Sequence, residues 1–239
     1  MKMPRFFKEN FADEPYICGD DAHHIIKSLR MRCGEELVVC DTKGTDYRCI
    51  ITGCTDTVSL EILKKTPSYA EPSVFVTLYQ CLTKGDKMDT IVRQAVESGV
   101  AKIVPVLSSN CVSRPDEKTL RKKTERWQKI AAEAAGQCGR GILPKVCDCM
   151  KLSDAAAEAG KLDISFFCYE LGGEPIGEIE KATETVGLII GPEGGFTAAE
   201  AELLVGLGSR ATTLGPRIFR AETAPIAALA AVMIRSGNM

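Results

Sequence analysis

Apolar and polar residues follow two different patterns along this chain, and the change falls near residue 70. In the first part, short β-type runs are separated by turn signals such as Asp41–Gly44. The runs predicted as strands are Arg5–Lys8, Glu36–Cys40, Tyr47–Gly53 and Val58–Leu63. One helix is predicted at about Asp20–Leu29, with Asp20 and Asp21 in position to cap it. This order is typical of a small β-barrel, which we expect over residues 1–68.

After a proline-containing linker at Lys64–Pro72, predicted strands alternate with predicted helices. The strands are Ser73–Leu82, Lys102–Leu107, Ile164–Tyr169, Val186–Ile190 and Ala211–Leu214. The helices are Asp86–Ser98, Asp116–Gln137, Ser153–Ala159, Ala198–Leu207 and Ala224–Arg235. Such alternation predicts an α/β domain over residues 73–239, with a largely parallel sheet covered by helices on both faces.

The amino-acid composition and the net charge limit which classes of protein are possible. The 239 residues are 45% hydrophobic and 26% charged, as in ordinary globular proteins, and a net charge of −2 requires any nucleic-acid contact to come from local basic patches. Eleven cysteines without a secretory segment favour a reducing cytoplasm. The longest apolar run, after Pro225, is too short to span a bilayer, so no membrane partner is expected.

The residues that could bind a metal are few and scattered. The two histidines, His23 and His24, are adjacent, and no Cys-x-x-Cys occurs. We therefore expect no metal site. Because the histidines lie in the small barrel, far in sequence from the glycine-rich loops, a structural or RNA-facing role is favoured over acid–base catalysis.

Glycines gather where predicted strands end. Gly191–Phe196 follows one strand and precedes a helix that Thr197 and Glu200 would start with a capping box. Glycine lets main-chain groups face a ligand, and ligands of open α/β sheets bind at the carboxyl ends of strands. A tight turn without a ligand is the alternative. Because Leu214–Ala224 and Tyr169–Gly173 have the same character, the three loops predict one backbone-lined pocket.

No G-x-G-x-x-G follows a strand and no G-x-x-x-x-G-K-[ST] occurs, so neither a dehydrogenase nor a kinase or ATPase is favoured. The loop G-P-E-G-G-F followed by L-G-x-R-I-x-R-x-E-T-A instead resembles the SPOUT methyltransferases, and more narrowly the bacterial ribosomal RNA small-subunit methyltransferase E family. Further matching pieces are Met3–Phe7, His24–Arg30, Lys84–Asp89 and Arg126–Gln137. The chain departs from the family pattern at Phe219, Ala221 and Cys138, where leucine, threonine and serine are expected.

The resemblance implies a PUA-like barrel followed by an α/β domain tied in a trefoil knot. It also implies a cytoplasmic homodimer that uses S-adenosylmethionine to methylate N3 of a uridine in 16S ribosomal RNA, in the small ribosomal subunit and not in DNA. The cofactor-binding residues would be Tyr169, Glu170, Leu171, Ile190, Gly191, Pro192, Glu193, Gly194, Gly195, Leu214, Gly215, Ile218, Phe219, Arg220, Thr223 and Ala224.

Uridine N3 carries a proton and is a poor nucleophile until that proton leaves, so the reaction needs a base or a group that stabilises the anion. Glu193 and Glu222 are the candidate bases, and Arg220 is the candidate cation. A helix-cap carboxylate and a surface ion pair are the simpler roles for these residues.

Basic residues mark candidate RNA contacts. The predicted set is Arg5, Lys27, Arg30, Arg32, Lys84, Lys87, Arg126, Gln137 and Arg140, with Lys2 in the same barrel patch. A solvated helix face is the simpler interpretation of the run around Arg126, and Arg30 and Arg32 could instead pair with nearby acids.

Three other functions remain open. The protein could be a SPOUT enzyme that acts on another nucleoside, such as a transfer-RNA ribose 2′-OH. It could be an RNA-binding assembly factor without activity, and a dehydrogenase is the weakest alternative. The apolar run Ala224–Met233 could cover the sheet or pack against a second copy.

Overall fold

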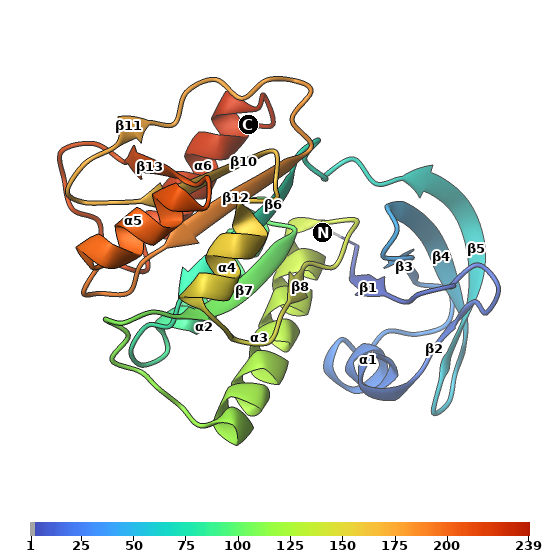
Figure 1. The fold of residues 1–239 in the computed structure, drawn as a ribbon. Coiled ribbons are helices and arrows are strands. Elements are labelled where there is room, and N and C mark those ends of the chain that lie inside the picture. The colour runs from blue at the N-terminus through green and yellow to red at the C-terminus, as the bar shows by residue number, and fades with distance from the viewer. Residues whose placement is uncertain (1–2) are drawn as a thin grey trace. The chain divides into compact units, whose positions relative to one another are not determined.

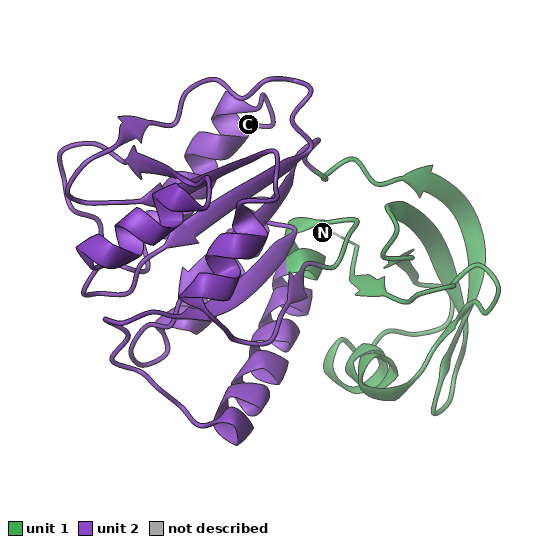
Figure 2. Cartoon of the chain, viewed as in Figure 1, with its two compact units in different colours: residues 1–71, 135–143 green, residues 72–134, 144–239 purple. Residues whose placement is uncertain are grey.

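The computed structural model describes residues 3–239 and divides the chain into two compact units (Figure 2). Unit 1 contains the chain up to Glu71 together with Ala135–Leu143, and unit 2 contains Pro72–Ala134 and Pro144–Met239. The chain therefore leaves unit 1, enters unit 2 and returns for nine residues. The sequence does not predict this return.

A five-stranded sheet forms the body of unit 1 (Figure 1). In sheet order the strands are β1 (Arg5–Phe7), β3 (Glu36–Cys40), β4 (Thr45–Cys54), β5 (Val58–Pro67) and β2 (Tyr16–Ile17). β1 and β3 are parallel and the other pairs are antiparallel. Alternate residues of β4 and β5, such as Cys49, Ile51 and Leu60, are buried in one apolar core. β5 runs on to Pro67, so the first half of the predicted linker is strand.

The predicted helix of unit 1 exists, but its start and its geometry differ from the prediction. It consists of α1 (Gly19–His23), which continues directly into a π-helical turn, η1 (His24–Ser28). Asp20 and Asp21 lie inside the first turn and no side chain caps the helix, so the predicted cap is wrong. Carboxylates in the first turn still favour the helix, because they face its positive end.

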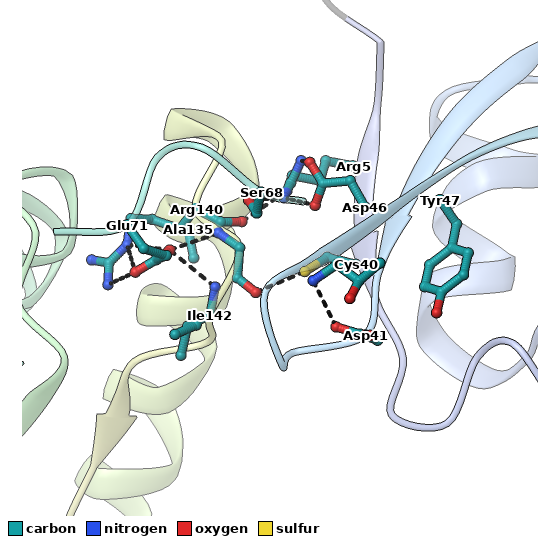
Figure 3. Close-up of polar contacts among 12 residues, drawn as sticks. Arg5, Cys40, Asp41, Asp46, Tyr47, Ser68, Glu71, Ala135, Arg140 and Ile142 are labelled. Atoms are coloured by element: carbon teal, nitrogen blue, oxygen red, sulfur yellow. Dashed lines mark hydrogen bonds and ion pairs between the residues drawn. The ribbon is translucent and has the colours of Figure 1, made fainter. Parts of the chain in front are cut away.

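Arg140 and Glu71 hold the returning segment inside unit 1 (Figure 3). The Arg140 guanidinium is buried and lies 2.7 Å from Glu71 Oε2. Glu71 Oε1 also accepts the backbone N–H groups of Gly141 and Ile142, at 2.7 and 3.0 Å. The segment is thus secured by one ion pair and by backbone hydrogen bonds to the same carboxylate.

β1 and β3 of unit 1 contact the same segment from the sheet side. Arg5 Nε donates to the Arg140 carbonyl at 2.8 Å, while its Nη1 donates to Asp46 Oδ2 at 2.8 Å (Figure 3). Cys40 Sγ contacts the Gly141 carbonyl at 2.8 Å. Burial opposes the charge on Arg5, but Asp46 outweighs it and raises the pKa of the guanidinium. Arg5 therefore forms a structural ion pair with Asp46, and Arg140 forms one with Glu71. Their placement does not support the RNA contacts predicted for them.

Unit 2 is built on an eight-stranded sheet in which every pair of strands is parallel. Its order is β11 (Glu174–Pro175), β13 (Arg210–Thr213), β10 (Ile164–Cys168), β12 (Thr185–Ile190), β6 (Phe75–Cys81), β7 (Lys102–Leu107) and β8 (Lys145–Val146), and β9 (Met150–Lys151) also pairs with β7. β6 and β12 are almost wholly buried, as expected for strands covered on both faces. The predicted parallel sheet is confirmed.

Five helices lie wholly or mostly in unit 2: α2 (Lys87–Glu97), α3 (Glu117–Cys138), α4 (Leu152–Ala159), α5 (Ala198–Gly206) and α6 (Ala224–Arg235). The last four residues of α3 belong to unit 1. α4 packs against α5 on one face of the sheet, and α2 packs against α6 on the other (Figure 1). α6 buries Ala228, Leu229, Val232 and Met233, so this face of the apolar run belongs to the core. Within residues 3–239 no helix has the length and apolar character needed to cross a membrane.

Candidate cofactor-binding site

Three loops of unit 2 meet at the carboxyl ends of β13, β10 and β12, which are neighbours in the sheet. They enclose a cavity of about 1060 Å³, lined by residues 168–173, 190–195, 212–221, Ala224 and Lys87. Of the predicted cofactor-binding residues, all but Thr223 line this cavity. Lys87 and Arg217 line it too, although neither was predicted to do so.

Two glycines of the loop after β12 lie close to neighbouring side chains. Gly195 has a φ of +64°, a conformation that favours glycine, and a Cβ there would lie 2.2 Å from Glu170 Oε1. A Cβ on Gly194 would lie 3.1 Å from Cβ of Asn110. Because glycine has no side chain, Gly194 and Gly195 line the cavity with backbone atoms, as the sequence predicts.

The predicted capping box at the start of α5 is confirmed. Thr197 Oγ1 accepts the Glu200 N–H at 3.2 Å, and Glu200 Oε2 accepts the Thr197 N–H at 2.9 Å. Burial opposes ionisation of Glu200, but the N–H groups of Ser109 and Thr197 outweigh it and lower the pKa of the carboxyl. The glycine loop thus ends in a rigid helix start.

Residues after β7 support the glycine loop, and the sequence analysis did not predict this. Asn110 Nδ2 donates to the carbonyls of Gly194 and Gly195 at 3.0 and 3.2 Å. The Ser109 N–H donates to Glu200 Oε1 at 2.7 Å. Polar residues directly after a predicted buried strand were the signal available in the sequence.

The two candidate bases meet at a single lysine. Lys87 Nζ lies 3.1 Å from Glu193 Oε1 and 3.2 Å from Glu222 Oε2. The Lys84 N–H also donates to Glu193 at 3.1 Å. Burial raises the pKa of Glu193, but these hydrogen bonds outweigh it and the pKa falls below its usual range. The pKa of Glu222 is lowered by its own backbone N–H and by Lys87. Both carboxylates are therefore ionised near neutral pH.

Exposed apolar and cationic side chains surround the mouth of the cavity. Ile218 is 87% exposed and Leu171 is 77% exposed, so large apolar surfaces face the solvent beside the backbone-lined wall. Arg220 is exposed and lines the same cavity. Apolar surface next to precisely placed polar groups is the usual make-up of a small-molecule site.

The predicted RNA contacts fall into two groups. Lys27, Arg30, Arg32 and Gln137 are exposed in unit 1, and Lys84 and Arg126 are exposed in unit 2. In the described part of the chain, neither Arg30 nor Arg32 forms a side-chain ion pair, whereas Arg126 pairs with Asp89. Lys2 lies outside the described residues.

No group of three or more His, Cys, Asp or Glu side chains among residues 3–239 is arranged to hold a metal ion. His23 and His24 are exposed in α1 and η1, and the ring of His24 meets the edge of Phe6 at a centroid distance of 6.3 Å. All eleven cysteines are free thiols.

Comparisons with known proteins cover both units. Residues 70–233 match the family described as an RNA methyltransferase domain, and residues 17–63 match an RNA methyltransferase PUA domain. Ribosomal RNA small subunit methyltransferase E of Bacillus subtilis (strain 168) is 32% identical, over 96% of each chain. The protein of the same name from Aquifex aeolicus (strain VF5) is 33% identical, over 83% of this chain and 81% of its own.

A solved structure extends the likeness to three dimensions. Ribosomal RNA small subunit methyltransferase E from Neisseria gonorrhoeae, bound to S-adenosyl methionine, is 30% identical and superposes with a TM-score of 0.89 over 98% of each chain. The fold, the loops at the carboxyl edge of the sheet and the relatives along almost the whole length agree, and the chain belongs to the ribosomal RNA small subunit methyltransferase E family of RNA methyltransferases.

Proposed function

We propose that this protein transfers a methyl group from S-adenosylmethionine to N3 of a uridine in 16S ribosomal RNA, in the cytoplasm. The observation that carries the proposal is the backbone-lined cavity between the loops of β10, β12 and β13. Membership of the family supports the cofactor and the RNA substrate class. The choice of uridine N3 comes from the resemblance in the loop sequences.

The cavity fits the proposed cofactor in size and in character. Its volume of about 1060 Å³ is close to the upper end of the roughly 300–1,000 Å³ typical of small-molecule sites. Backbone groups of residues 190–195 and 214–215 would hold the polar parts of the cofactor, while Ile218 and Leu171 would cover its apolar surface. When bound, the cofactor supplies an electrophilic methyl group on sulfur.

The residues of the chain would prepare the uracil ring for attack. Removal of the N3 proton leaves negative charge on the ring, and Arg220 would stabilise that charge. Glu193 and Glu222 are ionised and able to accept the proton, but their lowered pKa values make each a weaker base than an ordinary glutamate. We therefore assign the main contribution to stabilisation of the anion by Arg220.

We also infer the trefoil knot, and the position of Glu222 supports it. In the sheet, β13 is separated from β6 by β10 and β12, yet Glu222, which follows β13, pairs with Lys87 at the start of α2, which follows β6. The segment between β13 and α6 therefore crosses the carboxyl ends of β10 and β12. A knotted chain must contain such a crossing, because one segment has to pass through a loop that another segment forms.

RNA contact would come from exposed basic residues on both units, and a homodimer would bring two copies of the site together. Lys27, Arg30 and Arg32 of unit 1 are suited to bind phosphates, as is Lys84 of unit 2. Exposed apolar side chains on α5 and α6, Val205 and Ile234, offer surface for a second copy.

Methyl transfer from labelled S-adenosylmethionine tests the proposal. The acceptors are small ribosomal subunits and naked 16S ribosomal RNA, and the product is identified by nucleoside mass spectrometry. We expect 3-methyluridine with at least one acceptor. A different methylated nucleoside would contradict the uridine assignment, and an absence of both transfer and cofactor binding would favour an RNA-binding assembly factor.

A further inference from the structure

Lys87 connects chain segments that leave the sheet at three different strands. The lysine begins α2 after β6, Glu193 lies in the loop after β12, and Glu222 lies in the segment between β13 and α6. These strands are not consecutive in the sheet, because β10 separates β13 from β12. One ammonium group therefore joins three separate parts of the cavity wall.

The segment 214–223 has little else to hold its exposed part. Gly215, Pro216, Arg217, Ile218 and Arg220 are exposed. The other hydrogen bonds found for this segment are local, and they join it to residues no more than four positions away. For example, Gly215 N–H donates to Thr213 Oγ1 at 3.1 Å, and the Thr223 and Ala224 N–H groups donate to the Arg220 carbonyl at 2.9 Å each. In the described part of the chain, the Lys87–Glu222 ion pair is the polar side-chain contact that ties this segment to another element.

The negative charges of Glu193 and Glu222 explain why a cation is needed between them. Glu193 and Glu222 each place a carboxylate oxygen within 3.2 Å of Lys87 Nζ, so the two negative charges lie close together. Like charges at this separation repel unless a cation lies between them. Without Lys87, the repulsion would push the segment that bears Glu222 away from the glycine loop.

We propose that Lys87 is a positioning residue of the cofactor site: it pins segment 214–223 to the glycine loop and so closes the cavity around S-adenosylmethionine. The inference rests on the proposed function. It assigns Lys87 to the cofactor side, since both carboxylates engage its ammonium, whereas the sequence predicts an RNA contact. Arg220 lies two residues before Glu222, so the ion pair between Lys87 and Glu222 also fixes the position of Arg220 in the cavity.

The first measurement is calorimetric titration of the full-length protein with S-adenosylmethionine. Lys87→Met is expected to weaken binding about ten-fold, since two partly exposed ion pairs are lost and a repulsion is created. Lys102→Met is the matched control. It removes a lysine of similar exposure that pairs with Glu158 at 2.6 Å, at the opposite end of the strands, and should leave the affinity unchanged.

Two further variants test whether Lys87 acts by positioning segment 214–223, rather than by supporting the fold or by contacting the ligand directly. Lys87→Arg can still bridge both carboxylates and should recover most of the affinity. Combined with Glu222→Gln, the Lys87→Met substitution should cost less than half of what it costs alone, because the two residues act through one contact. Thermal unfolding of each variant shows that the fold is intact.

The possible outcomes test the role of Lys87 separately from the proposed function. If the unmodified protein binds no S-adenosylmethionine, the proposed function fails. If it binds and Lys87→Met binds equally well but loses affinity for 16S ribosomal RNA, Lys87 is an RNA contact and the inference is overturned. Fully additive effects of Lys87→Met and Glu222→Gln would also overturn it.

Discussion

Gly195 shows how a single backbone position prepares the site. Its φ of +64° is strained for any residue that has a side chain, and a Cβ there would lie 2.2 Å from Oε1 of the exposed Glu170 side chain, which would have to move. We expect Gly195→Ala to weaken S-adenosylmethionine binding at least about ten-fold, at a cost in stability of about 1–2 kcal/mol from the strained backbone.

Gly206→Ala is the control for this prediction. Gly206 ends α5, has ordinary helical geometry, and a Cβ there would contact nothing within 4 Å. The substitution should leave cofactor affinity unchanged and raise the unfolding free energy slightly, by up to about 1 kcal/mol. Calorimetry and denaturant unfolding measure the two effects, and equal losses of affinity in both variants would contradict the role of Gly195.

Glu200 supports the start of α5 only while it is charged. Its pKa in the folded protein is lowered from 4.5, so the stabilisation is complete above the unfolded value and is lost as the pH falls through the folded value. Glu200→Gln should therefore cost about 1–2 kcal/mol at neutral pH. The difference from the unmodified protein should shrink below about pH 4.

Denaturant unfolding at several pH values checks this prediction. Glu202→Gln is the control, because this exposed residue of α5 has no hydrogen bond or ion pair among those found in residues 3–239. A Glu200→Gln penalty that did not change with pH would show that its charge does not contribute.

Arg220 is the residue on which the proposed chemistry depends most. If it stabilises the developing anion, Arg220→Ala should lower kcat by about 10²–10³-fold, as the loss of one stabilising donor does in other enzymes. S-adenosylmethionine affinity, measured by calorimetry, should change much less than kcat. A large change in affinity with kcat retained would instead make Arg220 a cofactor-binding residue.

At the scale of elements, the return of Ala135–Leu143 to unit 1 depends on the buried pair of Arg140 and Glu71 (Figure 3). Glu71→Gln removes the negative charge that lies 2.7 Å from the buried guanidinium, so unit 1 should lose about 3–5 kcal/mol of stability. The exposed pair of Arg48 and Glu36 is the comparison, and Glu36→Gln should cost less than about 1 kcal/mol.

Hydrogen exchange of the β1 and β3 amides reports the stability of unit 1 separately from that of unit 2. Equal losses in the Glu71→Gln and Glu36→Gln variants would show that the buried pair does not hold the segment. The same contacts give Arg5 and Arg140 a structural role that the sequence did not predict, because a basic residue has the same sequence signature whether it is solvated or buried beside an acid.

Element ends were the least well predicted part of the fold. β5 continues to Pro67, where prolines and lysines had indicated a linker, because pairing with β4 overrides local composition. β2 was not predicted, since its two residues are too few to show alternation. By contrast β3, β7 and α6 begin and end where the pattern places them.

At the scale of the molecule, strand order decides where the functional residues meet. The loops at 168–173, 190–195 and 212–221 form one cavity because β13, β10 and β12 are neighbours in the sheet. Their sequence order does not reveal this adjacency. The parallel sheet predicts only that all three loops lie at the same edge.

What the sequence determined by itself is local: the glycines that must turn, the capping box of Thr197 and Glu200, and the strand–helix alternation, all of which depend on residues a few positions apart. Only the tertiary structure decided that Lys87 meets Glu193 and Glu222, and that Arg5 contacts Arg140, 135 residues away. The physical reason is that the partner of a charged side chain is chosen by which segments pack together, and many pairings are compatible with one pattern of charges.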